Sequence, residues 1–199
     1  AIHYAVDNGA KVINMSFGKG FSDHSDWVRD AIAYAGKNDV LIVAAAGNDG
    51  SNTDEVENYP DDQIGTGPEI SDTFLKVGAT TYNYDSDLVA GFSNYGKSSV
   101  DVFAPGEQIY SCYPKNKYEF AQGTSMAAPL VAGIAALIFS QYPTLSAKDV
   151  KNIIMESGFP ITKKMSLEDG SVVEFKNLSK SGKLVNAYNA LIMASKRSK

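Results

Sequence analysis

The strongest constraint on the fold is a strand, helix and strand pattern in the first quarter of the chain. The segments KVINMSFG (residues 11–18) and VLIVAAAGN (40–48) are short apolar runs typical of buried strands. Between them, Ser25 is placed to cap a helix that ends near Gly36, with apolar residues at helical spacing: Val28, Ala31, Ile32 and Ala35. Two strands joined by a helix are typical of a parallel sheet. The sequence therefore predicts an α/β fold, a mainly parallel sheet with helices on both faces.

The rest of the chain continues this alternation. An opening helix is predicted to end at Gly9, strands are predicted at FLKVGAT (74–80) and VDVFAPG (100–106), and a long apolar helix is predicted to begin near Ser125. Capping signals predict two later helices, and a turn signal predicts a hairpin; these signals are Ser146 with Asp149, Asn186, and Asp169 with Gly170. With 199 residues and no internal repeat, we expect one domain over residues 1–199.

Charge and cysteine content narrow the classes of partner. The formal net charge is −5, and no basic stripe is present to neutralise phosphates, so we expect no nucleic-acid partner. No uninterrupted apolar stretch suggests a membrane span, and we expect no membrane partner. Cys112 is the only cysteine, which excludes an internal disulfide framework and leaves the compartment open.

A serine lies where the long apolar helix is predicted to start, in GTSMAAP (residues 123–129). At a helix N-terminus, main-chain N–H groups lack intrahelical partners, and the helix dipole favours a developing negative charge. Gly123 and the alanines after Ser125 leave room for a substrate carbonyl group. Ser125 is therefore a candidate nucleophile, although from the local pattern alone a helix cap is the commoner explanation.

Two further segments place polar groups at the carboxyl ends of predicted strands, where open parallel sheets position their sites. Asn48 follows a run of small residues, and its amide could donate a hydrogen bond to an oxyanion together with the Ser125 N–H. Ser16, Phe17 and Gly18 end the neighbouring strand and could pair with an extended peptide. Taken singly, each segment also suits an ordinary turn.

In this order, VINMSFG, AAAGNDG and GTSMAAPLVAGIAALI resemble segments of the subtilisin-like serine proteases, the subtilases. The resemblance runs from Ala1 to about Gly158, and it implies hydrolysis of peptide or protein substrates through an acyl-enzyme. It implies that Ser125 is the nucleophile and that Asn48 is the side-chain oxyanion donor. The substrate-binding residues that it implies are Ser16, Phe17, Gly18, Ala44, Ala45, Ala46, Gly47, Gly123 and Thr124. A cis Tyr59–Pro60 bond and a secreted or cell-envelope location are also implied.

The aspartate and histidine motifs that accompany the nucleophile in this family have no counterpart in the chain. His3 and His24 lack the flanking glycines of the family motif, and we expect both to be structural or surface residues. We therefore expect a partial catalytic domain whose base lies in an upstream part, an inactive isolated chain, and self-association of that chain. The alternative is a catalytically dead, protease-like module that binds peptides. A different hydrolase fold is disfavoured because Ala127 stands where a Gly-x-Ser-x-Gly elbow needs glycine.

An acidic tract follows Asn48. Eight carboxylates and no Lys or Arg occupy residues 49–72. Because hard cations prefer oxygen ligands, a calcium site near Asp61 and Asp62 is one interpretation. The spacing matches no fixed loop motif, so a solvated acidic loop is the favoured interpretation, and no other cofactor is expected.

Overall fold

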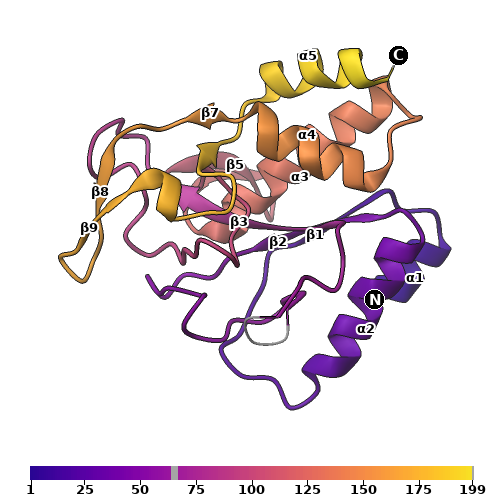
Figure 1. Cartoon of the computed structure of the whole chain (residues 1–199), viewed down its shortest axis with the longest axis horizontal. Helices are drawn as coiled ribbons and strands as arrows, with labels where there is room; N and C mark the ends of the chain where they lie inside the picture. Colours follow the sequence, from indigo (N-terminus) through magenta and orange to yellow (C-terminus); the bar gives the residue numbers. More distant parts are fainter. Residues whose placement is uncertain (64–66, 199) are drawn as a thin grey trace.

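The computed structural model describes residues 1–63 and 67–198. Its central element is a six-stranded sheet (Figure 1). The strand order is β1-β2-β3-β4-β10-β7, and only β7 runs antiparallel to its neighbour. The bounds are β1 Val12–Met15, β2 Leu41–Ala45, β3 Phe74–Thr80, β4 Val102–Pro105, β10 Lys183–Leu184 and β7 Phe159–Pro160. The four longer strands confirm the segments predicted from apolar runs.

Helices cover both faces of this sheet, as predicted (Figure 1). On one face lie α1 (Ile2–Asp7) and α2 (Ser25–Lys37), and on the other lie α3 (Thr124–Gln141), α4 (Ala147–Ser157) and α5 (Ala187–Arg197). Strand β2 is buried along its whole length, and its side chains alternate between the two cores. Ile42 packs with α1 and α2, whereas Val43 packs with α3. This two-sided burial explains why β2 is apolar at every position.

Most of the helix signals act as the sequence predicts. Ser146 and Asp149 form a reciprocal capping box on α4, and the Asn186 side chain accepts a hydrogen bond from the Asn189 N–H at 2.9 Å. The cap predicted at Ser25 is wrong, because Ser25 is the first helical residue and His24 occupies the cap position without a side-chain bond. The Ser25 hydroxyl instead accepts a hydrogen bond from Arg29 at 3.2 Å.

Two hairpins lie outside the main sheet. The predicted hairpin around Asp169 is confirmed as β8 (Lys164–Ser166) paired with β9 (Val172–Glu174), and a short helix, η1 (Phe175–Asn177), follows it. A second hairpin, β5 (Ile109–Tyr113) with β6 (Lys117–Ala121), was not predicted. The Tyr59–Pro60 peptide bond is cis, as expected.

Helix α3 carries apolar side chains on its exposed face as well as on the face that packs against the sheet. Its buried residues, including Val131, Ala135 and Ile138, face the sheet, while Leu130 and Leu137 are more than 40% exposed. By length and composition, α3 alone among the described helices could cross a membrane, contrary to the expectation from the sequence that no stretch is apolar enough. In this structure it packs as a core helix against β2, β3 and β4.

Candidate active site

Ser125 lies in the first turn of α3, at the carboxyl ends of β1 and β2. Gly123 precedes the helix with a φ of 139°, a conformation that favours glycine, and its N–H donates to the Gly106 carbonyl at 2.8 Å. The Ser125 hydroxyl donates to the Ser16 carbonyl oxygen at 3.1 Å. The nucleophile candidate and the end of β1 are therefore in direct contact, although 109 positions separate them in the chain.

A proline four residues after Ser125 explains the second contact between these residues. Pro129 has no N–H, so the Ser125 carbonyl loses its normal intrahelical donor. The Ser16 hydroxyl donates to that carbonyl at 2.8 Å, and Asn14 donates in turn to the Ser16 hydroxyl at 2.9 Å. Ser16, directly after β1, thus supplies the hydrogen bond that the proline cannot donate, and this bond fixes the end of β1 beside the start of α3.

The orientation of the Asn48 amide follows from Thr124. The Asn48 side-chain oxygen accepts the Thr124 N–H at 2.8 Å and the Thr124 hydroxyl at 3.0 Å, and that hydroxyl accepts the Gly47 N–H at 3.1 Å. Because a main-chain N–H can only donate, the amide oxygen must face Thr124. The amide nitrogen is therefore left to donate elsewhere, next to the first-turn N–H groups of α3.

A cavity of about 210 Å³ joins most of the residues singled out in the sequence. Seven of them line it, namely Phe17, Gly18, Ala45, Gly47, Asn48, Thr124 and Ser125, together with Lys19, Gly20, Asp49 and Asn58. Four others do not line it. Ser16 and Gly123 lie next to the cavity through the contacts above. Ala44 is fully buried in the core beneath α1 and α2, and Ala46, just after β2, is fully buried in a separate core cluster.

Asn94 holds the Asn48 loop in place, and sequence reasoning missed it. Its side chain donates to the Ala46 carbonyl and accepts the N–H groups of Asp49 and Ser51, each at 3.0 Å, while it is only 1% exposed. Gly47 lies against this amide with a φ of 104°, and a Cβ there would come within 2.3 Å of the Asn94 nitrogen. No motif in the surrounding sequence signals this role, which depends on contacts 43 or more positions away.

Neither histidine lies at this site. His3 lies against Tyr34 with ring centroids 4.6 Å apart and the rings tilted by 32°, and His24 stacks on Trp27 at 4.4 Å. Neither lines the cavity beside Ser125. Among the described residues 1–63 and 67–198, the only acceptor of the Ser125 hydroxyl is the main-chain carbonyl of Ser16.

The acidic tract is less solvated than the sequence suggested. Asp61 pairs with Arg29 at 2.9 Å, Asp54 accepts the N–H groups of Ser98 and Ser99, and Asp62 is only 7% exposed. Burial raises the pKa of the Asp62 carboxyl group to about 6. The interpretation as a solvated loop is therefore wrong for these positions. Within residues 1–63 and 67–198, no group of three or more His, Cys, Asp or Glu side chains is arranged to hold a metal ion.

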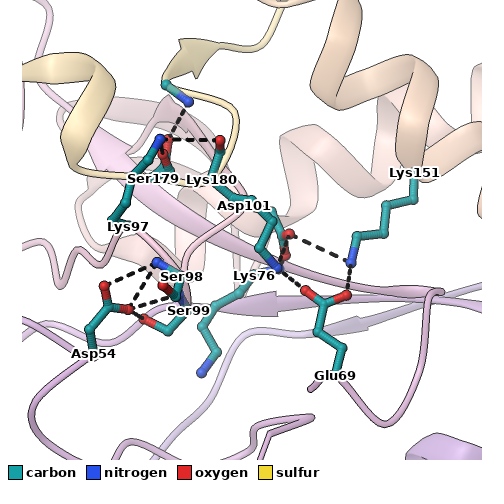
Figure 2. A network of polar contacts seen from close by, with 11 residues as sticks. Asp54, Glu69, Lys76, Lys97, Ser98, Ser99, Asp101, Lys151, Ser179 and Lys180 are labelled. Atoms are coloured by element: carbon teal, nitrogen blue, oxygen red, sulfur yellow. Dashed lines mark hydrogen bonds and ion pairs between the residues drawn. The ribbon is translucent and has the colours of Figure 1, made fainter. Parts of the chain in front are cut away.

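Charged side chains, Glu69 of this tract among them, also form a partly buried network (Figure 2). Lys151 lies 3.1 Å from Glu69 and 3.5 Å from Asp101, and Lys180 pairs with the same two carboxylates. Burial raises the pKa of Asp101 and lowers that of Lys76, which donates to the Asn58 carbonyl at 3.4 Å. The network links the sheet, α4 and the segment before β10, so its role is structural.

Comparison with known proteins agrees with this geometry. The chain is 43% identical to Subtilisin DY of Bacillus licheniformis over 151 residues, which is 76% of the chain and 50% of that protein. It is 40% identical to the cell wall-associated protease of Bacillus subtilis, over 81% of the chain and 16% of that protein. The solved structure of the prenylagaramide maturation protease PagA superposes with a TM-score of 0.75 at 30% identity, over 96% of this chain and 65% of that one.

These relatives are longer than the matched region, and the chain spans half the length of Subtilisin DY and less of the cell wall-associated protease. Residues 1–184 match the profile of the subtilase family, Peptidase_S8. This matched range includes the six-stranded sheet, the residues that line the cavity, and the two polar side chains at the cavity, Ser125 and Asn48. The chain belongs to the subtilase family of serine proteases.

Proposed function

We propose that the chain is the serine-bearing part of a serine endopeptidase that cleaves peptide or protein substrates. The observation that carries this proposal is the meeting of the Ser125 hydroxyl, the free side of the Asn48 amide and a cavity at one point. In the reaction, the Ser125 oxygen bonds to the scissile carbonyl carbon, and its proton passes to a base. The Asn48 amide nitrogen and the Ser125 N–H would hold the oxyanion.

Collapse of that tetrahedral intermediate breaks the peptide C–N bond, and the base returns the proton to the leaving amine. A water molecule then attacks the acyl-enzyme by the same route and releases the Ser125 hydroxyl. The segment of Ser16 to Gly18 would pair with the substrate main chain, and the 63% exposure of Phe17 within this segment supports that role. Ala45 and Gly47, which line the cavity, would form a wall of the pocket for the side chain before the scissile bond.

The base is the missing part of this mechanism. The Ser125 hydroxyl bonds to a main-chain carbonyl, which cannot take a proton at neutral pH, and both histidines pack against aromatic rings elsewhere. We infer that a histidine and its orienting aspartate come from a part of the domain outside this chain, and that the chain alone is inactive. A location in the secretory route or cell envelope agrees with the name of the cell wall-associated relative.

The same observation favours a second candidate, a module that binds peptides without cleaving them. The two candidates differ in the reactivity of Ser125 once the rest of the domain is present. We expect a fluorophosphonate probe to label the complete domain rapidly and the isolated 199-residue chain hardly at all.

Two matched variants locate the reaction. Ser125→Ala should abolish labelling and peptide cleavage by the complete domain. Ser140→Ala should change neither, because Ser140 is an exposed serine at the other end of α3 that donates to the Leu137 carbonyl and accepts from the Gln141 side chain. A complete, folded domain that resists the probe while binding peptides would identify the module without catalysis.

A further inference from the structure

The start of α3 is tied to the end of β1 by two hydrogen bonds that run in opposite directions between the same two residues. The Ser125 hydroxyl donates to the Ser16 carbonyl at 3.1 Å, and the Ser16 hydroxyl donates to the Ser125 carbonyl at 2.8 Å. The Ser125 hydroxyl has a single hydrogen, so it must leave the Ser16 carbonyl when it turns to a base. The bond from the Ser16 hydroxyl is therefore the one that can hold the main chain of Ser125 in place during the reaction.

Asn14 sets the direction of this lasting bond. A carbonyl oxygen can only accept, so the hydrogen of the Ser16 hydroxyl points at the Ser125 carbonyl. The Asn14 side-chain atom that lies 2.9 Å from the same hydroxyl must then be the amide nitrogen, which donates. Asn14 thus keeps the Ser16 hydrogen directed at the start of α3.

The residue pattern of β1 places both polar side chains on the side of the strand that faces α3. Val12 packs in the core that α3 shares, whereas Ile13 and Met15 pack in the core that α1 and α2 share. Because side chains alternate along a strand, Asn14 and Ser16 follow Val12 on the α3 side. This side of β1 changes from apolar to polar as it reaches the first turn of α3, where a carbonyl lacks its helical donor.

We propose that Asn14 and Ser16 are positioning residues, which hold the main chain of Ser125 while its hydroxyl turns from β1 to the base. This inference rests on the proposed function of the site. The Ser125 N–H, which would bind the oxyanion, belongs to the same anchored main chain, so a loosened anchor would misplace the nucleophile and an oxyanion donor together. The substrate would pair with main-chain groups, which side-chain substitutions leave in place, so the loss should fall on kcat rather than on KM.

The first test restores the missing helical donor in the complete catalytic domain. Ser16→Ala should lower kcat by about tenfold or more, with KM changed by less than about twofold. Pro129→Ala supplies an N–H four residues after Ser125, which can bond to the same carbonyl. In that background, Ser16→Ala should lower kcat by less than about threefold. A kcat ratio that is the same in both backgrounds would refute the role of the Ser16 hydroxyl.

The second test reverses the direction of the bond. Aspartate has nearly the shape of asparagine, but an ionised carboxylate can only accept. In Asn14→Asp at neutral pH, the Ser16 hydroxyl should therefore donate to the carboxylate and release the Ser125 carbonyl. We expect kcat to fall, and we expect Ser16→Ala to cost nothing further in this background. A full additional loss from Ser16→Ala would overturn the assignment of Asn14.

Two further variants serve as controls. Ser16→Thr keeps a hydroxyl group at the same position and should retain most of the parental kcat. Ser195→Ala also removes a hydroxyl that donates to a main-chain carbonyl, that of Ile192 at 2.9 Å. It should leave kcat unchanged, because Ser195 lies on α5, whose described residues are outside the lining of the cavity.

Urea denaturation of the complete domain separates this inference from the proposed function. If Ser125 is unreactive in the complete domain, the proposed function fails, but the same cycle of variants still measures the bond. A shift of the unfolding midpoint by Ser16→Ala that shrinks in the Pro129→Ala background supports the anchor, and equal shifts in both backgrounds refute it. An active domain in which Ser16→Ala and Asn14→Asp leave kcat unchanged refutes the positioning role and leaves the proposed function intact.

Discussion

Asn94 offers the sharpest test of how the site is held together. Asn94→Ala removes three hydrogen bonds to main-chain groups of the loop around Asn48, each 3.0 Å long, at a position only 1% exposed. At about 1 kcal/mol for each bond, the variant should lose about 3 kcal/mol of unfolding free energy. The loop that carries Asn48 should also loosen, so kcat of the complete domain should fall more than KM changes.

The measurement is urea denaturation followed by far-ultraviolet circular dichroism, with Asn52→Ala as the control. Asn52 lies in the same loop region but is more exposed, and its amide contacts the Glu55 side chain at 2.8 Å and the Asp54 N–H at 3.2 Å. We expect its replacement to cost less than about 1 kcal/mol. If Asn94→Ala loses no more stability than Asn52→Ala, the argument that Asn94 holds the loop is wrong.

Three further outcomes follow from the described contacts. In the complete domain, Asn48→Leu should lower kcat by roughly 10²–10³ with KM nearly unchanged, a magnitude taken from a subtilisin rather than worked out from this structure; equal kcat would contradict the oxyanion role. Burial raises the pKa of Asp62 from 3.8 to about 6, so the folded state holds this proton more tightly and loses stability as the pH rises from about 4 to above 6. Denaturation at pH 4 and pH 7 should therefore show Asp62→Asn gaining up to about 3 kcal/mol on the parent across that range, and a constant difference would refute the shift. Lys151→Met should cost about 3 kcal/mol of unfolding free energy because it leaves Asp101 buried with one fewer cation, and a loss below about 1 kcal/mol would show that Lys180 compensates.

The elements that the sequence predicts correctly are those with local patterns. Strand β2 and helix α4 follow from an apolar run and from a capping box, which are both properties of adjacent residues. The hairpin of β5 and β6 was missed because most of its residues are exposed on both faces, so no alternation marks it. Its turn also uses positive φ angles at Lys115 and Asn116, where a glycine would have given a signal.

For the site, the order of three segments was enough to single out Ser125 and Asn48 as candidate site residues. The side chains that hold them in position could not be predicted in the same way, because they act through contacts between segments far apart in the sequence. Asn94 lies in a polar stretch that looks like an ordinary loop, and its importance comes from its burial against Gly47 and its hydrogen bonds to the main chain. Asp62 looked solvent-exposed because its neighbours in the sequence are acidic, whereas the structure buries it. Such side chains are recognisable only once the fold brings distant segments together.

The hydrogen bonds between Asn48 and Thr124 can form only after the chain has folded, which affects what an unfolded or nascent chain can do. The amide can face a substrate only when its oxygen is held by a helix that begins 76 positions later in the chain. On the proposed role of Asn48, a nascent or partly unfolded chain therefore has no aligned oxyanion donor, whatever the state of its serine. Under the proposed function, proteolytic capacity would appear only on completion of folding, which would protect neighbouring proteins, and the chain itself, during synthesis.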